Sequence, residues 1–103
     1  MKLYRHGDVL IGSVAELPRG AKSRDGVTLA YGEVTGHSHR IADPSKAETF
    51  MHAGQLYLRV TSESAKLIHE EHNTIVLPQG IYRVWQQREY EPDTSTGWRT
   101  VYD

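Results

Sequence analysis

Cysteine is absent from this 103-residue chain, and long apolar runs are absent as well. Without cysteine there is no disulfide, no thiolate metal site and no thiol nucleophile, which suits a reducing compartment. No segment approaches the ~20 apolar residues that cross a bilayer, and residues 1–8 hold no apolar stretch of signal-peptide length. We therefore expect a cytoplasmic protein that does not contact a membrane.

The chain also lacks an excess of either charge. It has 12 basic and 13 acidic residues, so no overall electrostatic field attracts nucleic acid. A local basic patch on the surface is still compatible with this balance. Its length fits one domain. We expect a single β-rich domain over residues 1–103, in which the polar segment 91–97 is a mobile loop.

Helical periodicity is lacking too. The best helical candidate, 42–50, contains a proline and is interpreted as a loop with at most one helical turn. Apolar alternation instead predicts strands at 8–14, 27–31, 56–61, 65–69, 74–77, 81–85 and 98–102. The Leu-Pro-Gln-Gly segment at 77–80 predicts a hairpin turn. These features predict an all-β fold, a small barrel or sandwich of about six to eight short strands.

Histidine, by contrast, is abundant. Four of the six histidines occupy two motifs, Gly-His-Ser-His-Arg at 36–40 and His-Glu-Glu-His at 69–72. Alternate residues of a strand point the same way, so His37 and His39 are expected to share a face. A His-x-His pair serves metal sites and also paired acid–base catalysts. The isolated His6 and His52 are expected to be ordinary polar side chains.

The His-Glu-Glu-His motif leaves two geometries open. Residues three apart point to opposite faces of one strand, but a tight connection can bring them together. His69 is expected to point inward because it continues the alternation of Ala65 and Leu67. Either Glu71 shares its face or His72 converges on it. The neighbouring carboxylates could orient an imidazole, and an exposed charged turn is the alternative.

Two chemistries follow for these histidines. The first is a metal site of His37, His39 and His69, with Glu71 or His72 as a fourth ligand. Zn, Mn, Fe or Ni would suit it, although a protein without any cofactor fits the sequence equally. A zinc-bound water would make the protein a hydrolase. The second is metal-free acid–base cleavage, in which imidazoles transfer protons and a cation stabilises the phosphorane.

Both chemistries predict a hydrolase that acts on a small phosphodiester, a nucleotide or RNA. Its candidate catalytic residues are His37, His39, His69, Glu71 and His72. Side chains that could grip a nucleotide, and hence candidate substrate-binding residues, are Arg40, Arg83, Arg88, Tyr82 and Tyr90. The alternative is a non-catalytic module that binds a ligand or nucleic acid. We also expect a homo-oligomer, because a thin core and exposed strand edges gain from pairing.

The His-x-His at 37–39, Glu48 and the Pro-x-Gly at 78–80 resemble motifs of the cupin family. This resemblance implies a small β-barrel that binds a metal and carries out oxygen or isomerase chemistry. Two positions depart from the cupin pattern. Glu48 follows the second histidine by nine positions rather than a few, and Arg83 stands where cupins place a third histidine.

As a whole, the chain resembles short uncharacterised proteins of bacteria and their phages. These carry the motifs Gly-Glu-x-Thr-Gly-His-x-His, His-Glu-Glu-His and Tyr-Arg-Val-x-x-Gln-Arg-Glu-Tyr, found here at 32–39, 69–72 and 82–90. The resemblance implies that the three segments act as a unit, and it implies no particular reaction.

Overall fold

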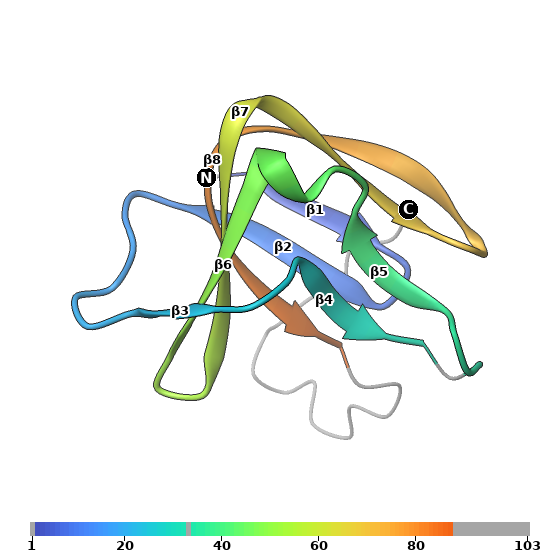
Figure 1. Cartoon of the computed structure of the whole chain (residues 1–103), viewed down its shortest axis with the longest axis horizontal. Coiled ribbons are helices and arrows are strands. Elements are labelled where there is room, and N and C mark those ends of the chain that lie inside the picture. Colours follow the sequence, from blue (N-terminus) through green and yellow to red (C-terminus); the bar gives the residue numbers. More distant parts are fainter. Residues whose placement is uncertain (1, 33, 88–103) are drawn as a thin grey trace, which may run out of the picture.

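The computed structural model describes residues 2–32 and 34–87, which are almost entirely β-structure (Figure 1). The elements in chain order are β1 Leu3–His6, β2 Val9–Val14, β3 Lys22–Arg24, β4 Thr28–Tyr31, β5 Ser38–Ile41, the 3-10 turn η1 Pro44–Lys46, β6 Ala47–His52, β7 Gln55–His69 and β8 His72–Gln86. The all-β prediction is confirmed. The expected loop at 91–97 and strand at 98–102 lie outside the described residues. Within those residues, no helix is long and apolar enough to cross a membrane.

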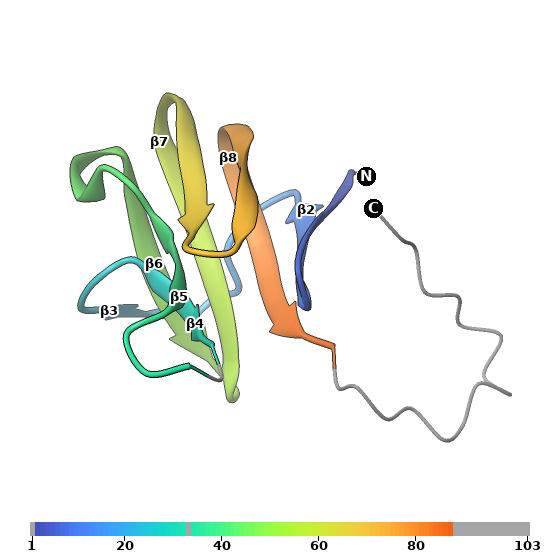
Figure 2. The same cartoon turned by 90° about the vertical axis from the view of Figure 1, so that its right-hand side faces the viewer.

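The strands form one antiparallel sheet that curls into a half-barrel. Its order is β1-β2-β8-β7-β5-β4, with β6 also paired to β7 and β3 paired to β6. Strand β7 pairs with β6 along its first half and with β5 near its end. Figure 2 shows β7 and β8 rising together and bending over at the top, which gives the sheet its curl. The half-barrel is therefore organised around these two strands.

Strands β7 and β8 are longer than predicted. Each has 15 residues, and each joins two segments that the sequence pattern had separated. The predicted hairpin at 77–80 is wrong, because this segment lies inside β8. The true turn between the long strands is the Glu70-Glu71 connection.

The reason is an irregularity in the ladder. The register shifts between the pairs Val60↔Gly80 and Ser64↔Pro78, so three residues of β7 face one residue of β8. A proline has no N–H to donate, and such a bulge tolerates it. The Tyr82 hydroxyl donates to the Pro78 carbonyl at 2.6 Å, which fixes the bend. The Pro-x-Gly segment therefore bends a continuous strand instead of ending it.

Strand β6 replaces most of the loop expected at 42–50. The 3-10 turn η1 accounts for the expected helical turn, and the Asp43 carboxylate caps it by accepting from Ser45 N–H at 3.0 Å. The residues that follow pair with β7 from Ala47↔Val60 to His52↔Gln55. This strand was missed because its apolar residues Ala47, Phe50 and Met51 do not alternate with polar ones, so that only its pairing with β7 shows it to be a strand.

The core lies along β2, β7 and β8. Its largest fully buried apolar side chains are Ile11, Leu58, Leu67 and Leu77. The fully buried set also includes two histidines, His6 and His39, each 2% exposed. The apolar core therefore ends at one side in buried imidazoles.

Truncating a core leucine tests this packing. Leu58 is completely buried, so Leu58→Ala should lower the free energy of unfolding by about 3 kcal/mol through lost burial and a residual cavity. The control Val76→Ala, at a residue that is 53% exposed on β8, should cost less than about 1 kcal/mol. Urea denaturation measures both, and equal losses would contradict the proposed core.

Candidate functional site

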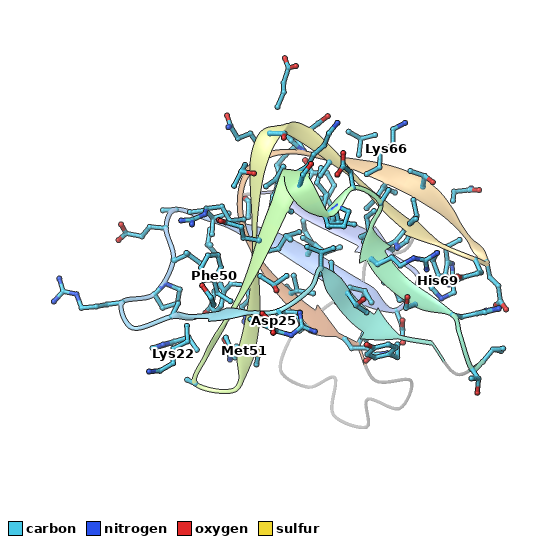
Figure 3. The ribbon with its side chains drawn as sticks, in the orientation of Figure 1. Lys22, Asp25, Phe50, Met51, Lys66 and His69 are labelled. Carbon is cyan, nitrogen blue, oxygen red and sulfur yellow. The ribbon has the colours of Figure 1, made fainter. Side chains whose placement is uncertain are left out.

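Five of the six histidines meet at one end of the half-barrel. Ring centroids are 4.3 Å apart for His39 and His69, 4.7 Å for His69 and His72, and 4.9 Å for His6 and His39. The ring of His37 lies 5.8 Å from that of His69. Figure 3 shows His69 at the side of the molecule away from Phe50 and Met51 of β6. The two histidine motifs are thus brought together.

The turn between β7 and β8 explains why His69 and His72 converge. The two residues pair directly across the hairpin, with only Glu70 and Glu71 between them. Side chains of directly paired residues project from the same face of a sheet. Of the two geometries left open by the sequence, the structure has the convergence of His69 with His72.

A carboxylate in this turn fastens β5 beside it. The Ser38 N–H donates to Glu70 Oε1 at 3.1 Å, and Arg40 Nη1 lies 3.0 Å from Glu70 Oε2. These hydrogen bonds, that from Arg40 above all, lower the pKa of Glu70 to about 2. The clamp therefore fixes the histidines on either side of Ser38 relative to the His-Glu-Glu-His turn.

The histidines border a hollow of about 480 Å³. Its lining residues are Arg5, Gly7, Asp8, Tyr31, Gly32, Val34, His37, His39, His69, Glu71, His72 and Gln86. Each predicted catalytic residue is among them. Sequence reasoning missed Asp8, Arg5 and Tyr31, because nothing local in the sequence shows that residues of β1, of the β1–β2 turn and of β4 face the motifs.

His6 was also missed, since it was expected to be an ordinary polar side chain. It is buried behind His39, with its Nδ1 2.9 Å from His39 Nδ1 and its Nε2 2.9 Å from the Asn73 carbonyl oxygen. One signal was available: Tyr4 packs against the core, and His6 continues its alternation. The alternation of β1 could therefore have shown that His6 points inward, toward the other histidines.

Burial favours the neutral form of His6, His39 and His69. Burial, together with the neighbouring His69 and His6, lowers the pKa of His39 to about 4 against the opposing effect of Asp8. Burial also lowers the pKa of His6 and, together with His72, that of His69. Neutral imidazole is the form that binds metal ions.

Two carboxylates contact the cluster. Asp8 Oδ1 lies 3.4 Å from His39 Nε2, while its Oδ2 accepts from Gln86 Nε2 at 2.7 Å. Glu71 Oε2 lies 3.0 Å from His37 Nδ1. One histidine is therefore flanked by Asp8 inside the hollow and another by Glu71 near the turn.

The cluster contains a group suited to a metal ion. One ligand atom each from His39, His69 and His72 lies within 4.8 Å of the others. In a tetrahedral zinc site two nitrogen ligands are about 3.3 Å apart. A small movement of the three imidazole rings toward one another would therefore bring their nitrogens to the spacing that zinc requires. His37, part of the set expected from the sequence, is outside this group and beside Glu71. The Glu71 N–H donates to His69 Nδ1 at 2.9 Å. Neutral His69 therefore carries its proton on Nε2, and it would bind a metal through Nδ1 after this hydrogen bond is released.

Among the residues that the structure describes, none of the expected substrate-binding side chains lines the hollow. Arg40 is engaged in the clamp, and Tyr82 is a core residue at 3% exposure, which corrects its expected role in substrate contact. Arg83 lies over the Trp85 ring in a second hollow of about 390 Å³, with 5.0 Å between guanidinium carbon and ring centroid. Arg88 and Tyr90 fall outside the described residues.

Gly7 keeps space for two of the rings. A Cβ at this position would lie 2.7 Å from His72 Nε2 and 3.1 Å from His39 Cε1, and its φ is +64°. Gly7→Ala should cost about 1 to 2 kcal/mol through the backbone and displace both imidazoles. The control Gly54→Ala has a similar φ of +76° but no atom within 4 Å. NMR of the imidazole resonances should show movement in Gly7→Ala alone. Unchanged histidine signals would contradict this packing.

Because burial lowers the pKa of His39, the free energy of unfolding should depend on pH. The unfolded chain binds a proton at the ordinary histidine pKa of 6.5, whereas native His39 does so only near 4. Stability in chelator should therefore be fully present above pH 6.5 and fall as the pH drops from 6.5 to about 4. The low pKa of Glu70 acts in a separate window, below its ordinary value of 4.5. Thermal denaturation across this range measures the effect, and a flat Tm between pH 6.5 and 4.5 would contradict it.

The comparison with known families matches residues 5–87 to the family described as "Domain of unknown function (DUF8820)". This match spans every residue that lines the hollow. No curated protein matches the chain, and no solved structure matches it. By its match over most of its length, the chain belongs to the DUF8820 family.

Proposed function

We propose that this protein is a divalent-metal-dependent hydrolase that acts on a small phosphodiester or nucleotide. The observation that carries the proposal is the convergence of His39, His69 and His72, whose ligand atoms lie within 4.8 Å of one another beside an open hollow. Three imidazoles with room for a water or substrate form the ligand set of many hydrolytic metal sites.

The charge state of His39 suits a metal ligand better than a catalytic acid. Metal-free cleavage needs a protonated imidazole to act as the acid and a cation to stabilise the phosphorane. His39 is neutral at pH 7, since its pKa is about 4. Arg40 is bound to Glu70, and Arg83 lies in the second hollow. Arg40 and Arg83 are therefore committed elsewhere, whereas neutral His39 is in the form that binds a metal.

Each residue then has a distinct role. His39, His69 and His72 would hold the ion, which supplies a water of lowered pKa. His37 would carry a proton to the leaving oxygen, and Glu71, 3.0 Å from its Nδ1, would stabilise the imidazolium. The metal site thus differs from that of cupins, because it would use only His39 of the His-x-His motif and take its further ligands from the His-Glu-Glu-His turn.

The surroundings support a phosphorylated substrate. Arg5 lines the histidine hollow, where its Nε donates to the Gly7 carbonyl at 2.9 Å, and its guanidinium places a positive charge there that suits a phosphate. Gln86 lines both this hollow and the second one, where Arg83 stacks on Trp85. An aromatic ring beside a guanidinium suits a nucleobase. Tyr31, at 75% exposure, offers another stacking surface at the histidine hollow.

Protein purified without a histidine tag tests the proposal by metal analysis and by hydrolysis of bis(4-nitrophenyl) phosphate and cyclic nucleotides. His39→Ala should lose both bound metal and activity, because it removes a ligand. His37→Ala should retain metal and lower kcat by about 10²- to 10⁴-fold, the usual contribution of a proton carrier. His52→Ala, outside the cluster, should change neither.

Each result that would contradict the proposed hydrolase points to a different alternative. A preparation that contains no metal and takes up none would overturn the proposal. Hydrolysis that persists in strong chelator would favour metal-free cleavage by the same histidines. Tight nucleotide binding without turnover under any metal condition would identify a binding module instead.

A further inference from the structure

We propose that Asp8 is a fourth ligand of the cation and that His6 is a positioning residue. By accepting the Nδ1–H of His39, His6 would keep the His39 imidazole in its Nδ1–H tautomer. This inference rests on the metal site of the proposed function. It concerns two residues of the β1–β2 hairpin, and neither belongs to the two histidine motifs.

The hydrogen bonds of His6 determine where its proton lies. A carbonyl oxygen only accepts, so the 2.9 Å contact with Asn73 places the proton of His6 on Nε2. The Nδ1 of neutral His6 is then an acceptor. Its contact with His39 Nδ1, also 2.9 Å, can form only if His39 donates from that atom.

The same reasoning continues into the hollow. With its proton on Nδ1, neutral His39 has a lone pair on Nε2. That atom faces Asp8 Oδ1 at 3.4 Å. A metal-binding histidine commonly donates its other ring N–H to a carbonyl or carboxylate, which fixes its tautomer. Here His6 receives that N–H, and the Asn73 carbonyl fixes His6 in turn.

The contact between His39 and Asp8 is the independent sign of a ligand. Two acceptors, a lone pair and a carboxylate oxygen, face each other with no proton between them, which is repulsive unless a cation joins them. Their 3.4 Å separation is close to the spacing of about 3.3 Å between two ligands of one tetrahedral zinc ion.

Asp8 is also held in place. Half of its side chain is exposed, so it could turn into solvent. Instead its Oδ2 accepts from Gln86 Nε2 at 2.7 Å, and this hydrogen bond directs Oδ1 toward His39. Gly7, between His6 and Asp8, leaves room for the His39 and His72 rings. The hairpin therefore supports His39 from behind and supplies a carboxylate in front.

The ligand half of the inference is tested with metal-free full-length protein titrated with Zn²⁺ by calorimetry and with Co²⁺ by visible absorption. Asp8→Asn should weaken affinity by about 10- to 100-fold and change the Co²⁺ spectrum, because a charged oxygen ligand is lost. The matched control Asp25→Asn, an exposed residue of the β3–β4 turn that is distant from His69 in Figure 3, should leave both unchanged.

The positioning half is tested by NMR, which distinguishes the two imidazole nitrogens through their ¹⁵N shifts. At pH 7 without metal, His39 should be the Nδ1–H tautomer. His6→Gln retains an acceptor for this N–H and should preserve the tautomer and most of the affinity. His6→Leu has no acceptor and should lose the tautomer preference and about 10- to 100-fold in affinity.

The outcomes separate this inference from the function on which it rests. If the wild type binds neither ion, the metal site of the proposed function fails and this inference with it. If the wild type binds but Asp8→Asn binds equally well, the ligand assignment is overturned and the three-histidine site stands. If His39 is the Nε2–H tautomer or is doubly protonated at pH 7, the positioning role of His6 is overturned, whether or not His6→Leu folds.

Discussion

The antiparallel pairing of β7 with β8 is the interaction on which the rest of the structure depends. It runs from Leu56↔Val84 to His69↔His72, and every other strand attaches to one of these two strands directly or through one neighbour. Its central irregularity bends both strands, so the sheet curls and its two flanks approach each other. Because the hairpin closes at the histidine pair, the same pairing that builds the core also delivers the His-Glu-Glu-His turn to β1 and β5.

The burial of imidazoles at the end of an apolar core is a demanding arrangement. A buried polar group without a partner costs free energy, so such groups require hydrogen bonds in the native state. The chain meets this requirement with the series Asn73, His6 and His39, and the Glu70 clamp secures the adjoining strand. A polar network satisfied in this way is rigid, and rigidity is what a site needs if its ligands are to be placed before any ion or substrate arrives.

Local patterns in the sequence predicted part of this arrangement. Alternation predicted the inward face of Leu56, Leu58 and Val60, and likewise the inward direction of His69. It could not reveal His6 or Asp8, because their place in the site depends on β1 and β2 pairing beside β8, more than sixty positions along the chain. The prediction that Tyr82 contacts substrate was wrong for a related reason. An aromatic side chain on a strand suits a base-stacking surface and a core equally, and only the residues that pack against it in the folded chain decide between the two.

The two ends of the half-barrel differ in how closely their turns are packed. The Gly7-Asp8 and Glu70-Glu71 connections are filled with ring atoms and carboxylates. The β6–β7 connection is open: a side chain added at Gly54 would meet nothing within 4 Å, and Figure 1 shows this turn projecting from the body. A fluorophore, an affinity handle or an immobilising linker introduced at Ala53-Gly54 would therefore lie away from the histidine cluster but beside the second hollow, which Gly54 also lines.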